Sequence, residues 1–282
     1  MSFTGSAVVG SDNNLSDLFT NIIAQARFTA EEQSLMLGLV TQYNIGNVAG
    51  KTIQVPKYPA IDAADLTEGT DMSSTRVNTS SVSVTVGEVG AQVVLTDLAA
   101  MGAGNPADEL GTVLGNAIAT KIDKDLIALF DGFSTSVGGA TTEFTAAHIF
   151  EAVAKLRNAG AVGQLSCVVN PLAAYNMKAN LTSTFANPNG GDLQNEAMRT
   201  GYVGTIAGVN VYESRNVAVS GDASKGAVFA PEALAIALKR DFNLEVQRDA
   251  SLRANELNAT AIYGVAELDD AYGVELHLES TI

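Results

Sequence analysis

The stretch that most constrains the fold lies within residues 51–98, where apolar residues recur at every second position instead of every third or fourth. Val82, Val84 and Val86 alternate with small hydroxyl residues, which predicts one long strand with an apolar and a polar face, running to residue 97. The earlier segment IQVPKY also predicts a strand. Its Pro56 cannot donate a ladder hydrogen bond, so we place this strand at the edge of a sheet.

Between the two strands lies the polar, acidic segment AIDAADLTEGTDMSSTRVN, which is rich in turn-forming residues. Together these parts predict a long two-stranded arm over residues 51–96 with a solvated tip. An isolated hairpin is only marginally stable in water. We therefore expect the arm to lie against a core, either elsewhere in the chain or on a neighbouring molecule.

The N-terminal part of the chain predicts helices. A helical spacing of apolar residues begins at Asn14, after a loose, polar start. Thr29 and Glu32 form a capping box that starts a second helix. The apolar face expected for this second helix consists of Leu35, Met36, Leu39 and Val40.

Residues 106–131 predict the longest helix. Asn105 is a good N-cap, Pro106 suits the first helical position, and Gly132 ends the apolar stripe. A second helix is expected over 145–160, followed by the strand QLSCVVN and a helix capped by Asn170. The rest of the chain predicts strands with one short helix near Pro231. Because no βαβ unit repeats, the fold class is α+β.

Composition limits the function. The 282 residues carry a net charge of −15, which argues against a surface that grips DNA or an anionic membrane but not against a shell that encloses DNA. No basic residue precedes Arg27 and polar residues interrupt the uncharged runs, so we expect no secretory peptide and no transmembrane helix. The single cysteine, Cys167, is predicted to be a buried strand residue. A cytoplasmic product is expected.

Residues 49–52 read AGKT, which matches the end of the nucleotide-binding pattern G-x-x-x-x-G-K-[ST]. The first Gly of that pattern is replaced by Ile45, and Gly46 comes one residue late. A phosphate loop follows a strand and opens a helix, whereas here we expect a helix before AGKT and a strand after it. We interpret the segment as a turn into the arm, with a nucleotide-dependent enzyme as the alternative.

No HExxH, paired CxxC, EF-hand or GxSxG pattern is present, so we expect no enzyme activity and no cofactor. His148 and His277 are interpreted as packing or surface residues. Acidic residues gather at the arm tip and near the C-terminus, where a solvated surface is favoured over a cation site at a subunit contact. They are Asp62, Asp65, Glu68 and Asp71, and Glu267, Asp269, Asp270, Glu275 and Glu279.

Four segments follow one another in a recognisable order. They are the VPK strand opening an arm with Glu68-Gly69 near its tip, the capped helix 106–131, GTIAGVNVYESRNV (204–217) and VFAPEALAIAL (228–238). This order resembles the major capsid proteins of tailed bacteriophages, the Hong Kong ninety-seven type of shell fold. The resemblance spans most of residues 45–275.

The resemblance implies an α+β phage capsid fold in four parts. They are an N-terminal arm with helices (1–50), an extended β-hairpin loop (51–96), a peripheral domain with the spine helix 106–131 (97–142 and 240–282), and an axial domain of mixed α/β structure (143–239). It also implies a major capsid protein that self-assembles into hexamers and pentamers and forms the icosahedral head shell around double-stranded DNA, without sequence-specific binding.

Further partners implied by the resemblance are a portal protein and scaffolding or decoration proteins, with no membrane, and the location is the virion after synthesis in the host cytoplasm. Covalent cross-linking is not expected, because Lys51 and Lys57 lie at the arm base. We expect charge to steer the subunit contacts. The candidates for these contacts are Lys57, Asp65, Glu68, Asp71, Arg76, Arg240, Arg248 and Arg253.

Two other structural roles remain as alternatives. The first is an encapsulin, a bacterial compartment shell that holds an enzyme cargo. The second is a surface or fibre protein, which the absence of a secretion signal disfavours.

Overall fold

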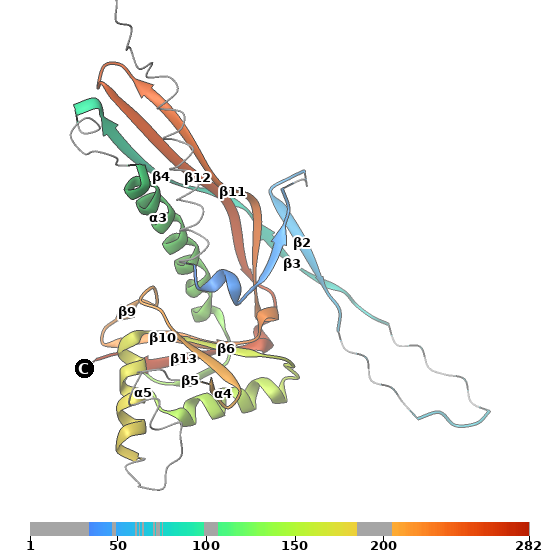
Figure 1. The fold of residues 1–282 in the computed structure, drawn as a ribbon. Helices are drawn as coiled ribbons and strands as arrows, with labels where there is room; N and C mark the ends of the chain where they lie inside the picture. The colour runs from blue at the N-terminus through green and yellow to red at the C-terminus, as the bar shows by residue number, and fades with distance from the viewer. Residues whose placement is uncertain are drawn as a thin grey trace, which may run out of the picture.

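Two β-sheets, a long helix and a projecting hairpin make up the fold (Figure 1). The computed structural model describes residues 34–46, 49–59, 61, 63, 65–69, 71, 74, 76–98, 107–184 and 205–281. The helix predicted from Asn14, the capping box at Thr29 and the cap at Asn105 lie outside the described residues. No helix in the described ranges is both long and apolar enough to cross a membrane.

The upper body in Figure 1 is a four-stranded sheet with a long helix along one face. Strand β1 runs parallel to β11, and the other neighbours are antiparallel. The strand order is β1 (Thr41–Asn44), β11 (Leu234–Asp249), β12 (Ala254–Glu267) and β4 (Gly87–Thr96). The helix α3 (Ala107–Ile127) continues into the 3-10 helix η2 (Ala128–Gly132), so the helical path ends at Gly132 as predicted.

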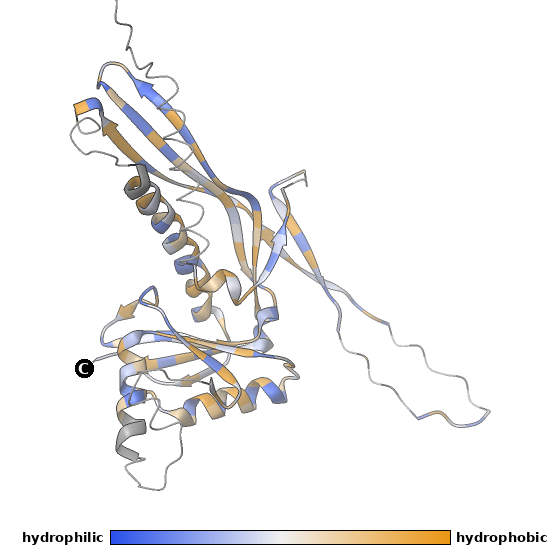
Figure 2. Ribbon diagram, in the orientation of Figure 1, coloured by the Kyte–Doolittle hydropathy of each residue, from blue (hydrophilic) through white to orange (hydrophobic). Residues whose placement is uncertain are grey.

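Helix α3 packs on this sheet because both elements turn apolar residues inward. Leu114, Ile118 and Leu126 of the helix share one core with Leu257 and Ala259 of β12. Apolar and polar residues alternate along the strands, so the opposite face of the sheet is largely polar (Figure 2). This core makes the long helix and the sheet one body.

The lower body is a mixed, seven-stranded sheet. Its strands follow the order β5 (Ser136–Gly138), β13 (Gly273–Glu279), β10 (Ala223–Phe229), β6 (Leu165–Val169), β8 (Val209–Glu213) and β7 (Thr205–Ile206), with β9 (Val219–Ser220) paired to β10. Helices α4 (Ala146–Asn158) and α5 (Pro171–Thr184) confirm the two helices predicted here. Cys167 lies in β6 in a second core with Ile149 and Met177, which confirms its buried position.

The hairpin consists of β2 (Thr52–Lys57) and β3 (Ser80–Thr85), which, within the described ranges, pair only with each other. The prediction of one unbroken strand from residue 80 to 97 is wrong. The chain leaves the hairpin at Val86, and the following strand β4 pairs with β12 in the upper sheet. The paired part of the predicted arm 51–96 is therefore shorter than expected, because an alternating pattern defines the faces of a strand and not its partner.

The second predicted helix is also wrong in its extent. In the part of this segment that the structure describes, from Ser34 on, the helical structure is the 3-10 turn Met36–Gly38, η1, and the chain then enters β1. Thr41 pairs with Ala235, so pairing with β11 prevails over the helical spacing of Leu39 and Val40.

Sheet pairing differs from the expected domain division at the C-terminus. Strand β13 was expected with the upper body, but it pairs with β10 and β5 in the lower sheet. The short strand β5 lies in a Gly/Ser/Thr-rich link for which no strand was predicted. Two 3-10 helices, η3 (Pro231–Ala233) and η4 (Asp270–Tyr272), lie where β11 begins and where β13 begins.

Candidate assembly surfaces

The hairpin loop exposes large apolar side chains. The exposed fractions are 68% for Tyr58, 57% for Ile61 and 65% for Leu66. Among the described residues, apolar packing around the hairpin is confined to its base, where Ile53, Val55 and Val84 join a small cluster. Figure 1 shows the described residues of the loop, with 65–69 among them, lying away from both sheets. Exposed apolar groups on a segment that builds no core of its own are typical of a surface that binds another molecule.

Four predicted contact residues lie on this loop, and all are exposed: Asp65, Glu68, Asp71 and Arg76. None of them forms an ion pair within the described part of the chain. Asp62, which was predicted to belong to the same acidic group, lies outside the described residues. The described residues of the loop therefore present three carboxylates and one guanidinium group to solvent.

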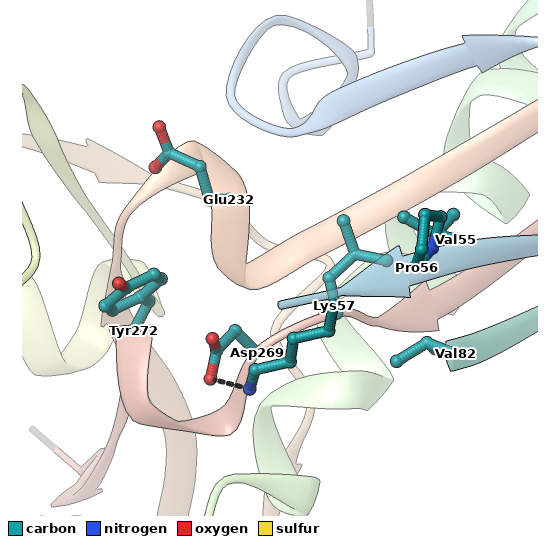
Figure 3. Close-up of a pocket in the computed structure, with 8 residues that line it drawn as sticks. Val55, Pro56, Lys57, Val82, Glu232, Asp269 and Tyr272 are labelled. Atoms are coloured by element: carbon teal, nitrogen blue, oxygen red, sulfur yellow. Dashed lines mark ion pairs between the residues drawn. The ribbon is translucent and has the colours of Figure 1, made fainter. Parts of the chain in front are cut away.

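Lys57, at the end of β2, contacts its own chain. Its Nζ lies 2.6 Å from Oδ1 of Asp269, just before η4. The pair borders a cavity of about 140 Å³ between the hairpin base and the body (Figure 3). Its lining residues are Val55, Pro56, Lys57, Val82, Glu232, Leu268, Asp269 and Tyr272. The hairpin thus stands off from the body here, with an ion pair at the edge of the gap.

Further carboxylates surround this junction. Asp270 accepts hydrogen bonds from the backbone N–H and the hydroxyl of Ser134. Burial, and then the neighbouring Asp270 and Asp269 carboxylates, raise the pKa of Glu267 above its ordinary value. The described residues contain no cluster of ligands that could hold a metal ion, so the cation-site alternative has no support there.

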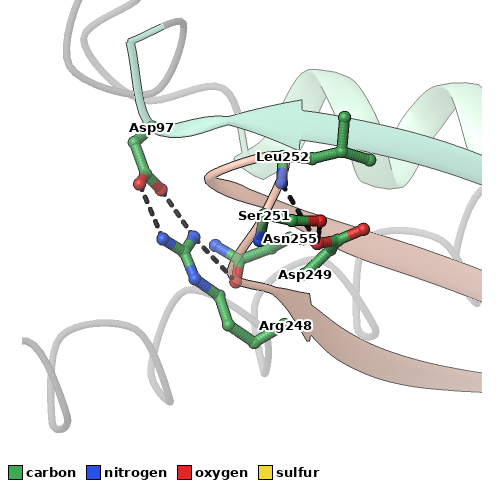
Figure 4. Close-up of polar contacts among 6 residues, drawn as sticks. All are labelled: Asp97, Arg248, Asp249, Ser251, Leu252 and Asn255. Atoms are coloured by element: carbon green, nitrogen blue, oxygen red, sulfur yellow. Dashed lines mark hydrogen bonds and ion pairs between the residues drawn. The ribbon is translucent and has the colours of Figure 1, made fainter.

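The two predicted arginines of the upper sheet have partners within the chain. Arg248 forms two hydrogen bonds to Asp97, at 2.6 and 2.7 Å (Figure 4), and this lowers the pKa of the Asp97 carboxyl. Arg240 contacts Glu88 at 3.2 Å. Arg253, in the turn between β11 and β12, is exposed and has no ion pair among the described residues.

One buried polar site was missed by sequence reasoning. Asp123 on α3 is 1% exposed and accepts from the Ser34 hydroxyl at 2.7 Å and from the N–H groups of Leu35 and Met36. Asn216, in the lower body, donates to the same carboxylate at 3.5 Å. Asp123 therefore ties the segment before β1 to the long helix and the lower body. An acidic residue amid the apolar stripe of α3 was the available signal.

The two histidines lie in regular secondary structure, His148 in α4 and His277 in β13. Nδ1 of His148 accepts from the backbone N–H of Thr145 and closes the capping box of α4. His277 lies on β13 and pairs with Gly138. Burial raises the pKa of the Cys167 thiol, which disfavours the reactive thiolate.

AGKT connects two strands. The segment before it is β1 and not the predicted helix, but β2 follows it as expected. Gly50 has a φ of 108°, which suits a turn, and its carbonyl accepts from Lys239. Because no helix opens after Lys51, the N–H groups that would cradle a phosphate are not arranged as in a nucleotide loop.

The geometry defines a class of fold: a mixed α/β subunit with two sheets and a hairpin that projects from them. A family model described as phage capsid protein matches residues 79–275, so the chain belongs to the phage capsid protein family. Its function is that of a capsid protein of a phage head shell, built from many copies of the chain. This confirms the resemblance and favours it over the encapsulin alternative.

Relatives and solved structures agree with this assignment. The chain is 24% identical over 229 residues to the major capsid protein of Staphylococcus phage phiMR11, covering 80% of each chain. The capsid structure of the cyanophage P-SCSP1u matches with a TM-score of 0.70 at 18% identity, covering 88% of this chain and 89% of the other. A Mycobacterium phage Che8 structure matches with a TM-score of 0.69 at 19% identity, covering 86% and 90%. The mixed α/β fold is thus similar to those of phage capsids.

Proposed function

We propose that this chain is the major capsid protein of its phage and that it assembles into rings of six and five, which close into an icosahedral head shell around double-stranded DNA. The observation that carries the proposal is the projecting hairpin, whose loop exposes Tyr58, Ile61 and Leu66. Such a loop gains stability only when a second surface covers it. In a shell of identical subunits, that surface belongs to a neighbouring copy.

The contact is heterologous, since the hairpin of one subunit meets a different patch on the next. Heterologous contacts close into rings when the rotation between subunits is right. Apolar side chains of the loop supply the buried area, while Asp65, Glu68, Asp71 and Arg76 steer the approach by charge. Arg253 is the best-placed basic partner among the predicted arginines, because Arg240 and Arg248 already hold carboxylates of their own chain.

The parts of the subunit have distinct roles in this proposal. The upper body, with α3 as the spine helix, is the peripheral domain, and the lower body is the axial domain. Sheet pairing supports including β5 and β13 in the axial domain. Residues 1–28 reach across a neighbour as an N-terminal arm.

The charge of the chain suits the enclosed genome. A net charge of −15 limits adhesion of the inner wall to DNA, so that the DNA is held without sequence-specific binding and can leave. The subunit is made in the host cytoplasm and is not an enzyme. Portal protein and scaffolding or decoration proteins complete the particle.

Electron microscopy and light scattering of the purified chain test the proposal. We expect closed particles of uniform size, either from the chain alone or on co-expression with a scaffolding protein. Removing residues 60–78 should leave a soluble, folded subunit that makes no shells. Shells of normal size from this deletion would show that the hairpin is not the assembly element.

A further inference from the structure

The chain leaves the hairpin at a close crossing, where the end of β3 passes over β12 of the upper sheet. At Gly264 in β12, an added Cβ would lie 2.3 Å from the carbonyl oxygen of Thr85 and 3.1 Å from the Cα of Val86. These distances are too short for any side chain. Glycine is therefore required for the end of β3 to pass over the sheet at this height.

The crossing has a small core of its own. Val84 and Val86 are buried there with Ala237 of β11, and Val86 donates its backbone N–H to the Lys51 carbonyl at 2.8 Å. These contacts hold both strands of the hairpin at the same position along the sheet. Beyond this position, within the described residues, β2 and β3 pair only with each other.

One ion pair links the hairpin to the body past the crossing. Lys57, the last residue of β2, reaches Asp269 beside the cavity shown in Figure 3. The carboxylate is itself fixed, because its Oδ1 accepts from the Ala271 N–H at 3.1 Å at the start of η4. The cavity leaves room for the hairpin base to tilt, and the ion pair opposes that tilt.

We propose that Gly264 and the Lys57–Asp269 ion pair set the direction in which the hairpin projects before any neighbour binds it. The consequence for assembly rests on the proposed function: a hairpin that already points outward loses less conformational freedom when it docks. The close crossing is the main determinant of direction. The half-exposed ion pair is the weaker one, since such pairs are screened by solvent.

Pulsed electron paramagnetic resonance on unassembled subunits tests the proposal. Spin labels placed by Asp65→Cys on the loop and Asn158→Cys at the end of α4 report the distance from the hairpin tip to the body; both sites are exposed. Cys167 is fully buried and does not compete for the label. We expect a single, defined distance distribution for the otherwise unchanged chain.

Gly264→Ala should shift the mean of this distribution, because the new methyl group displaces Thr85. Gly87→Ala is the matched control at the same crossing, since an added Cβ there meets nothing within 4 Å. Asp269→Asn keeps the acceptor for Ala271 but removes the charge, and it should broaden the distribution, as should Lys57→Met. Lys155→Met, which breaks a surface ion pair with Glu151 away from the hairpin, should change nothing.

Unchanged distributions in Gly264→Ala, Lys57→Met and Asp269→Asn would overturn the proposal. If Gly264→Ala fails to fold, the other two variants decide: unchanged distributions in both overturn it. The measurement needs no shell, so its outcome is separate from that of the deletion of residues 60–78. Altered distances together with normal shells from that deletion would preserve this inference and show that the hairpin is not the assembly element.

Discussion

Strands β3 and β4 follow one another in the chain and share one alternating pattern, yet they belong to different structures. In β4, Val89, Ala91 and Val93 pack against the core between α3 and the sheet. In β3, burial is confined to the end nearest the crossing, where Val84 is covered. The same pattern therefore stabilises the subunit in one place and, in the proposed function, supplies a contact element in the other. The difference is whether the apolar face meets a cover within its own chain.

The largest expected effect is on the body. Phe130 is fully buried and its ring centroid lies 5.5 Å from that of Phe229. Phe130→Ala should destabilise the subunit by about 3–5 kcal/mol, because it leaves a cavity in the main core. Denaturant unfolding of unassembled subunits measures this. Leu66→Ala on the hairpin is the counterpart: it should leave stability within about 0.5 kcal/mol but lower the yield of shells. Equal destabilisation by both would remove the distinction between the two regions.

The next effect concerns the buried Asp123. Asp123→Ala leaves the Ser34 hydroxyl and the N–H groups of Leu35 and Met36 without their acceptor. A buried donor left without an acceptor costs about 1–3 kcal/mol of stability. We expect a clear fall in the denaturation midpoint. Asp123→Asn keeps one acceptor oxygen. Its denaturation midpoint should lie between that of Asp123→Ala and that of the natural chain. Lys124→Ala, on the exposed side of the same helix, is the control; a loss as large as that of Asp123→Ala would argue against a role of the buried site.

A charge reversal on the hairpin should affect assembly and leave folding unchanged. Glu68→Lys places a cation among residues expected to face basic groups of a neighbour, so particle yield should drop strongly while the unfolding midpoint stays constant. Sedimentation and electron microscopy measure the yield, with Glu68→Gln as the milder control. Combining Glu68→Lys with Arg253→Glu should restore particles if these residues meet. No drop in yield for Glu68→Lys would count against charge steering.

The smallest expected effect is a pH dependence at the junction. The pKa of Glu267 is raised in the folded state, so the folded chain binds this proton more tightly than the unfolded chain does. The charged carboxylate therefore costs stability at neutral pH, and this cost disappears as pH falls below the ordinary value of 4.5. Glu267→Gln should raise the melting temperature slightly at pH 7 and make no difference near pH 4. Glu68→Gln is the control. A gain in melting temperature from Glu267→Gln that persists at pH 4 would contradict the raised pKa of Glu267 as its cause.

Local patterns determined much of this fold. Helix-capping residues and apolar stripes specified α4 and α5, and period-two alternation marked β2, β3 and β4 as strands, because these features depend on neighbours in the chain. The order of motifs was specific enough to place the chain in its family. Exposed charges at the loop, such as Glu68 and Asp71, could also be identified as a group. Their roles as contacts remain predictions.

Tertiary structure decided which elements meet. It ended the second helix at Gly38 and drew Thr41–Asn44 into the sheet, it separated β4 from the hairpin, and it placed β13 in the lower body. It also joined Lys57 to Asp269 and Asp97 to Arg248, across large distances in sequence. A sequence pattern specifies the period and the faces of an element, because these follow from backbone geometry. It does not specify the partner, because pairing depends on the packing of the whole chain.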